Sequence, residues 1–105
     1  MYLLTIDNIP GSKIGALGLV KGATVQTKHF GKDIMAGLKT LVGGEIKGYT
    51  EMLNEARQIA TEIMIKEAEA LDADAIIGIR FSSSEVMNGA AEIVAYGTAV
   101  KIITE

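Results

Sequence analysis

One long amphipathic segment, which follows the Gly43-Gly44 pair, constrains the fold more than any other part of the sequence. At about 100° per residue, its apolar side chains fall on one stripe and its polar side chains fall opposite for about six turns, which is typical of a helix packed on a core. We predict a helix from Lys47 or Tyr49 onward, ended by Asp72 in a left-handed conformation. The stripe comprises Met52, Leu53, Ala56, Ile59, Ala60, Ile63, Met64, Ala70 and Leu71.

Two residues depart from this pattern. Glu67 falls near the middle of the apolar stripe, and Ile65 falls on the polar face. A buried Glu67 could serve as an acid or a metal ligand, but we favour a carboxylate in solvent or paired with a cation such as Arg80, because carboxylates are rarely buried alone. Ile65 is either a single exposed apolar residue or part of a contact between subunits.

The apolar content is high for so short a chain. Of 105 residues, 49% are hydrophobic, and the mean hydropathy is +0.30. A folded monomer of this mass keeps about 5,700 Å² accessible and buries about 65% of its extended-chain surface. No run reaches the ~18 apolar residues of a membrane helix, and the N-terminus lacks the basic region of a signal peptide. We therefore expect a cytoplasmic protein that buries surplus apolar surface between identical subunits.

Composition and motifs also exclude several classes of function. The chain has no cysteine, which rules out disulfides, thiolate metal sites and thiol nucleophiles. Its net charge of −3 argues against nucleic-acid binding. The glycines match neither the Walker pattern nor GxGxxG. Four N-terminal lysines could attract an anion, but such spacing is typical of a solvated face; they are Lys13, Lys21, Lys28 and Lys32.

The remaining segments predict a single domain with a β-sheet and a second helix. Asp33–Val42 is the shorter helix, with Asp33 as its N-cap. Gly15, Gly18 and Gly22 predict a bent or bulged second strand. Asn88-Gly89 is the strongest hairpin signal. The four strands are predicted at residues 2–6, 14–27, 75–85 and 91–103.

Alternation along the last two strands predicts their faces. In the third strand Ile77, Ile79 and Phe81 are expected to share one side. The last strand is partly apolar on both sides, so both sides are expected to be covered. One side takes the long helix, and the other needs a partner molecule.

Three segments resemble a known family. They are residues 42–57 (VGGEIKGYTEMLNEAR), 73–81 (ADAIIGIRF) and 95–100 (AYGTAV). Together they resemble the YbjQ-like family of small bacterial and archaeal proteins over nearly the whole chain. The resemblance implies an α+β, dodecin-like subunit, with one long and one shorter helix on an antiparallel sheet, and ring-shaped homopentamers. The sequence departs from the family pattern at Asp72, where Gly is usual, and between His29 and Asp33, where it is shorter.

The family is also labelled a heavy-metal-binding domain. That label alone suggests a metal ion, and the residues themselves identify no cofactor. The candidate ligands are few: His29, Asp33 four residues later, and Glu67. A helical turn would place His29 and Asp33 on one face, although Gly31 weakens that turn. A fivefold ring could repeat a single His or Glu into a five-ligand site. We interpret His29 as a surface or loop residue and assign no metal site.

An enzyme is not indicated. The serines at 82–84 offer hydroxyl groups, but one histidine would have to provide every base, and serines beside a hairpin are typical of turns. Glu45, Glu51 and Glu55 could bind a hard cation, but we interpret them as solvated acids of a helix face. We therefore predict a homopentameric module that binds a small ligand or a metal ion, with a scaffold for protein partners as the alternative.

Overall fold

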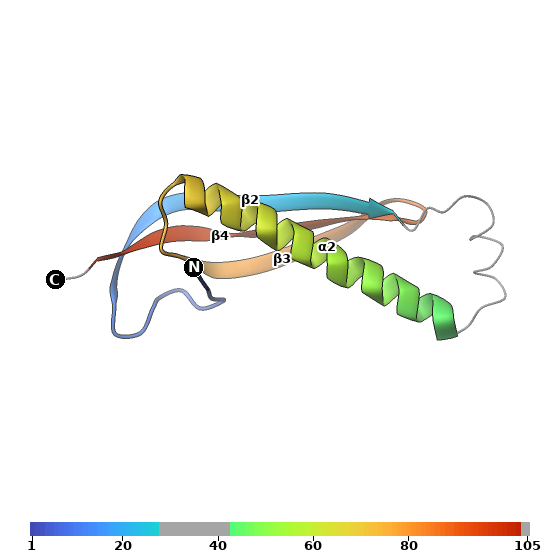
Figure 1. Cartoon of the computed structure of the whole chain (residues 1–105), viewed down its shortest axis with the longest axis horizontal. Coiled ribbons are helices and arrows are strands. Elements are labelled where there is room, and N and C mark those ends of the chain that lie inside the picture. The colour runs from blue at the N-terminus through green and yellow to red at the C-terminus, as the bar shows by residue number, and fades with distance from the viewer. Residues whose placement is uncertain (28–42, 104–105) are drawn as a thin grey trace.

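The computed structural model describes residues 1–27 and 43–103, which form a four-stranded sheet with one long helix across one face (Figure 1). The strand order is β1-β3-β4-β2. The helix predicted at 33–42 lies outside the described residues. The elements are β1 (Tyr2–Leu3), β2 (Lys13–Thr27), α2 (Gly43–Ala70), β3 (Ala75–Met87) and β4 (Ala90–Ile103).

The sheet is mixed, so the prediction of a wholly antiparallel sheet is wrong. Its three long strands are antiparallel neighbours, but β1 runs parallel to β3, with Tyr2 opposite Ala75. The chain stays beside β3 after β1 ends, because Leu4 N–H donates to the Ile76 carbonyl and Gly78 N–H donates to the Ile6 carbonyl. The N-terminal segment pairs with β3 at the edge of the sheet. No hairpin connects β1 to β3, so the two strands are free to run parallel.

The prediction of one long helix is confirmed, and α2 begins four residues earlier than Lys47. Its C-terminal end has the predicted left-handed residue, since Asp72 has φ +60°. Asp72 N–H donates to the Glu69 carbonyl, and Ala73 N–H donates to the Ala68 carbonyl. These bonds satisfy carbonyls that the last turn would leave unpaired, and the chain then turns directly into β3.

Small residues bring α2 very close to β2. A Cβ atom at Gly22 would overlap the Ala60 carbonyl oxygen and lie 2.9 Å from the Ile63 Cβ. Ile65 packs against the resulting core, so its assignment to the polar face was wrong, because the buried stripe drifts around the helix as it crosses the sheet. The buried core on this side comprises Val20, Ala56, Ala60, Met64, Ala68, Ile76, Ile79, Ile93, Ala95 and Ala99.

A bulge in β3 overturns the predicted sharing of one face by Ile77 and Ile79. The register with β4 shifts between Ile77 and Arg80, and Gly78 adopts φ +63°. Ile79 therefore packs on the helix side with Ile76, while Ile77 packs on the opposite side. An extra residue with a left-handed glycine exchanges the faces of every following side chain.

Within one copy, the described residues cover both faces of the last strand only at one end, and the prediction of a partner on the second face stays a prediction. On the side away from α2, Val100 is 1% exposed and packs with Ala75 and Ile77. Residues of the N-terminal segment cover this second cluster. They are Leu4, Ile9 and Ile14.

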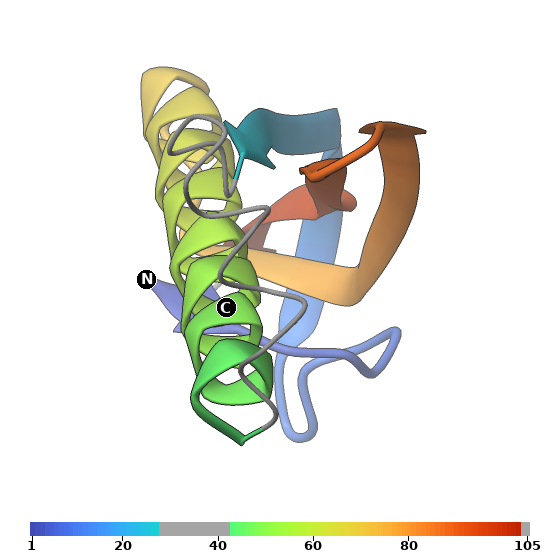
Figure 2. The same cartoon turned by 90° about the vertical axis from the view of Figure 1, so that its right-hand side faces the viewer.

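The chain is long and thin. It measures 61 × 22 × 17 Å, and its radius of gyration is 17.5 Å, against about 13 Å for a compact domain of this length. Its accessible surface is 6840 Å², about 1,200 Å² more than a globular monomer of this mass exposes. Viewed along the strands, the sheet has α2 on one side (Figure 2).

Candidate interaction surface

Among residues 1–27 and 43–103, none covers the side of the sheet away from α2 toward the β3–β4 hairpin, and we call this region the open face. The register places the β2 residues Leu19, Lys21, Ala23 and Val25 there, because they pair with β4 residues whose side chains point away from the helix. Leu19 is 66% exposed and Val25 is 54% exposed. The open face comprises Leu19, Lys21, Ala23, Val25, Arg80, Ser82, Ser84, Glu92, Val94 and Tyr96.

One cross-strand row at the centre of the open face places an aromatic ring between two cations. Tyr96 of β4 is directly opposite Lys21 on one side and Arg80 on the other. Directly opposite residues have Cβ atoms about 5 Å apart, so the three side chains are neighbours. Tyr96 is 39% exposed although it lies on the central part of the sheet. This row gives the open face an apolar centre with a positive border.

The Arg80 side chain is held by backbone groups. Its Nη1 atom donates to the Thr5 carbonyl at 3.0 Å and to the Ile79 carbonyl at 2.9 Å. The N-terminal segment thus fixes the guanidinium beside the edge of β3. A fixed guanidinium loses little side-chain entropy when a partner binds it.

Glu67 is exposed, and its carboxylate accepts a hydrogen bond from the Lys21 backbone N–H at 3.1 Å. This bond occupies an N–H group that faces away from β4, at the outer edge of the sheet. The expected solvent exposure of Glu67 is confirmed, but Arg80 is not its partner. An acceptor on an edge N–H limits pairing with a further strand at this point.

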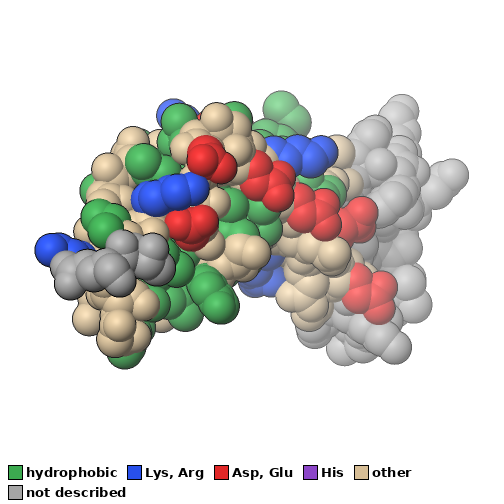
Figure 3. Space-filling view, turned by 60° about the vertical axis from the view of Figure 1, so that its left-hand side comes forward, with side chains coloured by type: hydrophobic (Ala, Val, Ile, Leu, Met, Phe, Trp, Pro, Cys, Tyr) green, Lys and Arg blue, Asp and Glu red, His purple; other side chains and the backbone are tan. Residues whose placement is uncertain are grey.

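A second partly exposed apolar surface lies on the side of α2 next to β2. Met52 and Ile59 are half-buried, and Ile63 is 42% exposed. The three residues are seven and four positions apart, so they share one face of the helix. Glu55 and Glu62 border them on the solvent side, and both are exposed. We call these five residues the helix flank. Acidic side chains form a row along one side of the molecule (Figure 3).

An apolar hollow of about 430 Å³ lies beside the β3–β4 hairpin. Gly89 adopts φ +78° in the turn, which confirms the hairpin predicted from Asn88-Gly89. The size of the hollow suits a small apolar molecule. It is lined by Val25, Thr27, Val86, Met87, Asn88 and Ala90.

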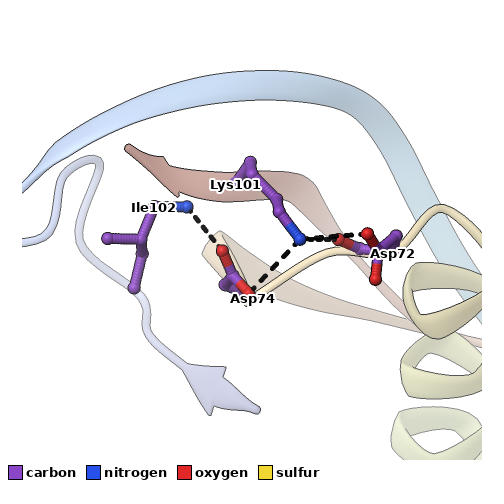
Figure 4. Close-up of polar contacts among 4 residues, drawn as sticks. All are labelled: Asp72, Asp74, Lys101 and Ile102. Atoms are coloured by element: carbon purple, nitrogen blue, oxygen red, sulfur yellow. Dashed lines mark hydrogen bonds and ion pairs between the residues drawn. The ribbon is translucent and has the colours of Figure 1, made fainter. Parts of the chain in front are cut away.

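The main charged cluster of the described residues lies at the opposite end, where Lys101 joins β4 to the end of α2 (Figure 4). Its Nζ atom donates to the Asp72 carbonyl at 2.9 Å and to Asp72 Oδ2 at 3.1 Å, and lies 3.7 Å from Asp74 Oδ1. Asp74 Oδ2 also accepts the Ile102 N–H at 2.8 Å. The hydrogen bond with Asp72 raises the pKa of Lys101 above 10.5. Each charged group of this cluster is already paired within the fold. The cluster therefore stabilises the left-handed turn at Asp72, and we call it the clamp.

The candidate metal ligands do not form a site in the part of the chain that the structure describes. His29 and Asp33 lie outside the described residues. Among the described residues, no three His, Cys, Asp or Glu side chains gather within reach of one ion. Glu51 and Glu55 are exposed on α2, as expected for solvated acids. Because heavy metals favour sulfur and imidazole ligands, the described residues of one copy do not fit such an ion.

Other candidate groups are also dispersed. Lys13 and Lys21 lie on either side of the bulge of β2, between Ala16 and Gly18, so they belong to different faces; Lys28 and Lys32 lie outside the described residues. The serines at 82–84 are exposed along β3 and alternate between its two sides. No helix of the described residues is long and apolar enough to cross a membrane.

Sequence reasoning did not single out the open face or the helix flank. The alternation in β2 indicated Leu19 and Val25 as apolar, but only the register with β4 shows that these residues, Lys21 and Tyr96 form one surface. The feature of the sequence that indicates such a surface is the apolar content of both sides of the last strand. That signal predicts an uncovered face without giving its position along the strand.

Comparisons with known proteins identify a family and a shared fold. Residues 1–103 match the model of the YbjQ-like family, described as "Putative heavy-metal-binding". The UPF0145 protein of Clostridium novyi is 57% identical over 98% of this chain and 100% of its own length. The UPF0145 protein of Thermotoga petrophila is 63% identical over 97% of each chain. A solved structure from Pediococcus pentosaceus, a protein of unknown function in the DUF74 family, superposes with TM-score 0.71 at 20% identity over 98% of each chain, which shows a shared fold.

Proposed function

This chain belongs to the YbjQ-like family, and from that premise we propose that it is a non-catalytic binding module that works as a ring of identical copies, a homopentamer. The ring holds a small ligand between its subunits. The proposal rests on what a single copy leaves uncovered.

The observation that carries the proposal is the surplus of exposed surface. One copy exposes about 1,200 Å² more than a compact monomer of its mass, and stable protein interfaces bury about 1,200–2,000 Å² in total. The surplus includes the apolar side chains of the open face, such as Leu19 and Val25. Apolar patches of this kind are typical of association sites.

The hairpin hollow indicates the class of ligand. Its lining is aliphatic apart from Thr27 and Asn88, so it favours a small apolar molecule. Among the described residues of one copy, no three metal donors gather, so a site shared by several copies is the form of metal binding that the ring would favour. His29 is the one imidazole in the sequence and would be the donor that a ring repeats.

The proposal includes no catalytic activity. The names of the similar proteins state no reaction. The serines at 82–84 are exposed on a strand, and the described residues include no histidine to activate them.

A scaffold for protein partners is the second candidate, and the same open face supports it. An assembled ring that still exposes Leu19 and Tyr96 would present an apolar surface to another protein. An assembled ring that buries them leaves the binding module as the better account.

Native mass spectrometry of freshly purified protein tests the proposal. The expected result is a species of five 11.1 kDa subunits that keeps its mass on dilution, with additional mass where a ligand is retained. A single 11.1 kDa species at micromolar concentration would overturn the ring. Solvent accessibility of Tyr96 in the assembled protein, measured by hydroxyl-radical labelling, separates the module from the scaffold.

A further inference from the structure

We propose that the open face of the sheet receives the helix flank of a second copy, so that each subunit contributes two different surfaces to the assembly. This inference rests on the proposed self-association and names the surfaces that perform it.

The two surfaces are both apolar. The open face exposes Leu19, Val25 and Tyr96, and the helix flank exposes Ile63 beside the half-buried Met52 and Ile59. Both are apolar strips, and neither is fully covered by the described residues of the copy that carries it. Removal of apolar surface from water favours their association.

The two surfaces also carry complementary charges. On the open face, Lys21 and Arg80 stand on either side of Tyr96. On the helix flank, Glu55 and Glu62 border the apolar strip. Each surface also carries one charge of the other sign. Those charges are Glu92 on the open face and Lys66 one turn after Glu62 on the helix.

The charge count therefore favours contact between unlike surfaces. The open face keeps one net positive charge, and the helix flank with Lys66 keeps one net negative charge. Two open faces or two helix flanks would bring like charges together, which is costly at an interface. Unlike surfaces bring Lys21 and Arg80 toward Glu55 and Glu62.

The positions of the two surfaces bear on the symmetry of the assembly. The open face lies on the side of the sheet away from α2, whereas the helix flank lies on the side that carries α2. A contact between two different surfaces is heterologous, and heterologous contacts form a ring when the rotation between neighbours closes. This geometry accounts for a ring of identical copies without a further element.

A charge exchange tests the pairing. Lys21→Glu and Glu62→Lys are made singly and then together in one full-length chain, and assembly is followed by sedimentation over a dilution series. Each single variant should raise the dissociation constant at least about tenfold, because it places like charges at every contact. The double variant should recover most of the loss, because every contact again joins opposite charges.

Controls separate a loss of assembly from a loss of folding. Glu85→Lys reverses an exposed charge of β3 that lies on neither surface, and it should assemble like the unaltered chain. Leu19→Ser removes an apolar contact of the open face without altering charge, and it should weaken assembly to a similar degree. Circular dichroism should show an unchanged helix signal in every variant.

The outcomes are distinguishable. An unaltered chain that stays at 11.1 kDa overturns the proposed ring itself. An oligomeric unaltered chain whose Lys21→Glu, Glu62→Lys and Leu19→Ser variants all assemble normally overturns the surfaces named here and leaves the ring intact. Single variants that assemble weakly, together with a double variant whose assembly does not recover, overturn the pairing between Lys21 and Glu62.

Discussion

The two halves of β4 differ in how many of their faces the chain covers. At Val100, α2 and the N-terminal segment cover opposite faces, and the side chain is 1% exposed. Val94 lies six residues earlier, and its side chain points to the same side of the strand as that of Val100. At this position α2 covers the opposite face, and the face that carries the Val94 side chain is open. The strand has the same alternation in both halves. A complete core therefore depends here on the short segment that contains Leu4 and Ile9 and not on the strand itself.

The length of the N-terminal segment decides which half of the sheet the described residues leave open. The N-terminal segment ends at the start of β2, so it reaches only the half of the sheet near Val100. No described residue of the same chain closes the other half, and under the proposed self-association a second copy closes it. The open half also carries the hairpin hollow, which places apolar surface and a cavity at the same end.

The largest expected effect comes from disrupting the packing of α2 on β2. Gly22→Ala places a Cβ against the Ala60 carbonyl and should force α2 away from β2, which costs about 3 kcal/mol of the free energy of unfolding. Ala23→Val, at the next residue but on the open face, should change stability by less than about 0.5 kcal/mol. Urea unfolding of both variants measures the difference. Equal losses would show that the close helix contact is unimportant.

The same substitution at two positions of β4 tests the comparison directly. Val100→Ala should cost about 2 kcal/mol, because it removes buried methyl groups from a closed cluster. Val94→Ala should cost less than about 1 kcal/mol under conditions that dissociate the assembly. At higher protein concentration the Val94 loss should grow, since a partner would then bury that side chain. A loss at Val94 that ignores concentration would contradict self-association at the open face.

A smaller effect concerns pH and the clamp at the covered end. The pKa of Lys101 is raised in the folded state, chiefly by the hydrogen bond with Asp72, so its stabilising contribution is complete below pH 10.5. That contribution should disappear as pH rises through the raised folded-state pKa. Thermal unfolding of Lys101→Met should therefore match that of the unaltered chain only at the most alkaline pH. A difference in melting temperature that stays constant as pH rises would show that Lys101 stabilises the fold through packing and not through its charge.

The smallest expected effect comes from metal ions. Added Zn²⁺, Cu²⁺ or Ni²⁺ should raise the melting temperature by no more than about 1–2 °C, because the described residues of neither half gather three metal ligands. Differential scanning fluorimetry measures the shift. A large shift that His29→Ala abolishes would instead support a metal site that the ring builds from one residue of each copy.

Periodicity predicted the elements well and their faces less well. The long helix, the hairpin at Asn88-Gly89 and the bulged second strand all follow from local pattern and turn chemistry. The prediction that Ile77 and Ile79 share a face was wrong because one extra residue at Gly78 exchanges the two sides of a strand. A glycine within the apolar run was the available signal for that bulge. Ile65 was placed wrongly because a straight helical wheel ignores the angle at which α2 crosses the sheet.

The sequence by itself determined the amphipathic helix, the strands, the left-handed turn at Asp72 and an excess of apolar residues, because each depends on neighbours in the chain. Only the tertiary structure decided that β1 is parallel, that Glu67 bonds to the edge of β2, and that Lys21, Tyr96 and Arg80 form one row. These features depend on strand register, which joins residues far apart in sequence. Burial is a property of such long-range contacts, so the position of the open face becomes visible only when the strands are paired.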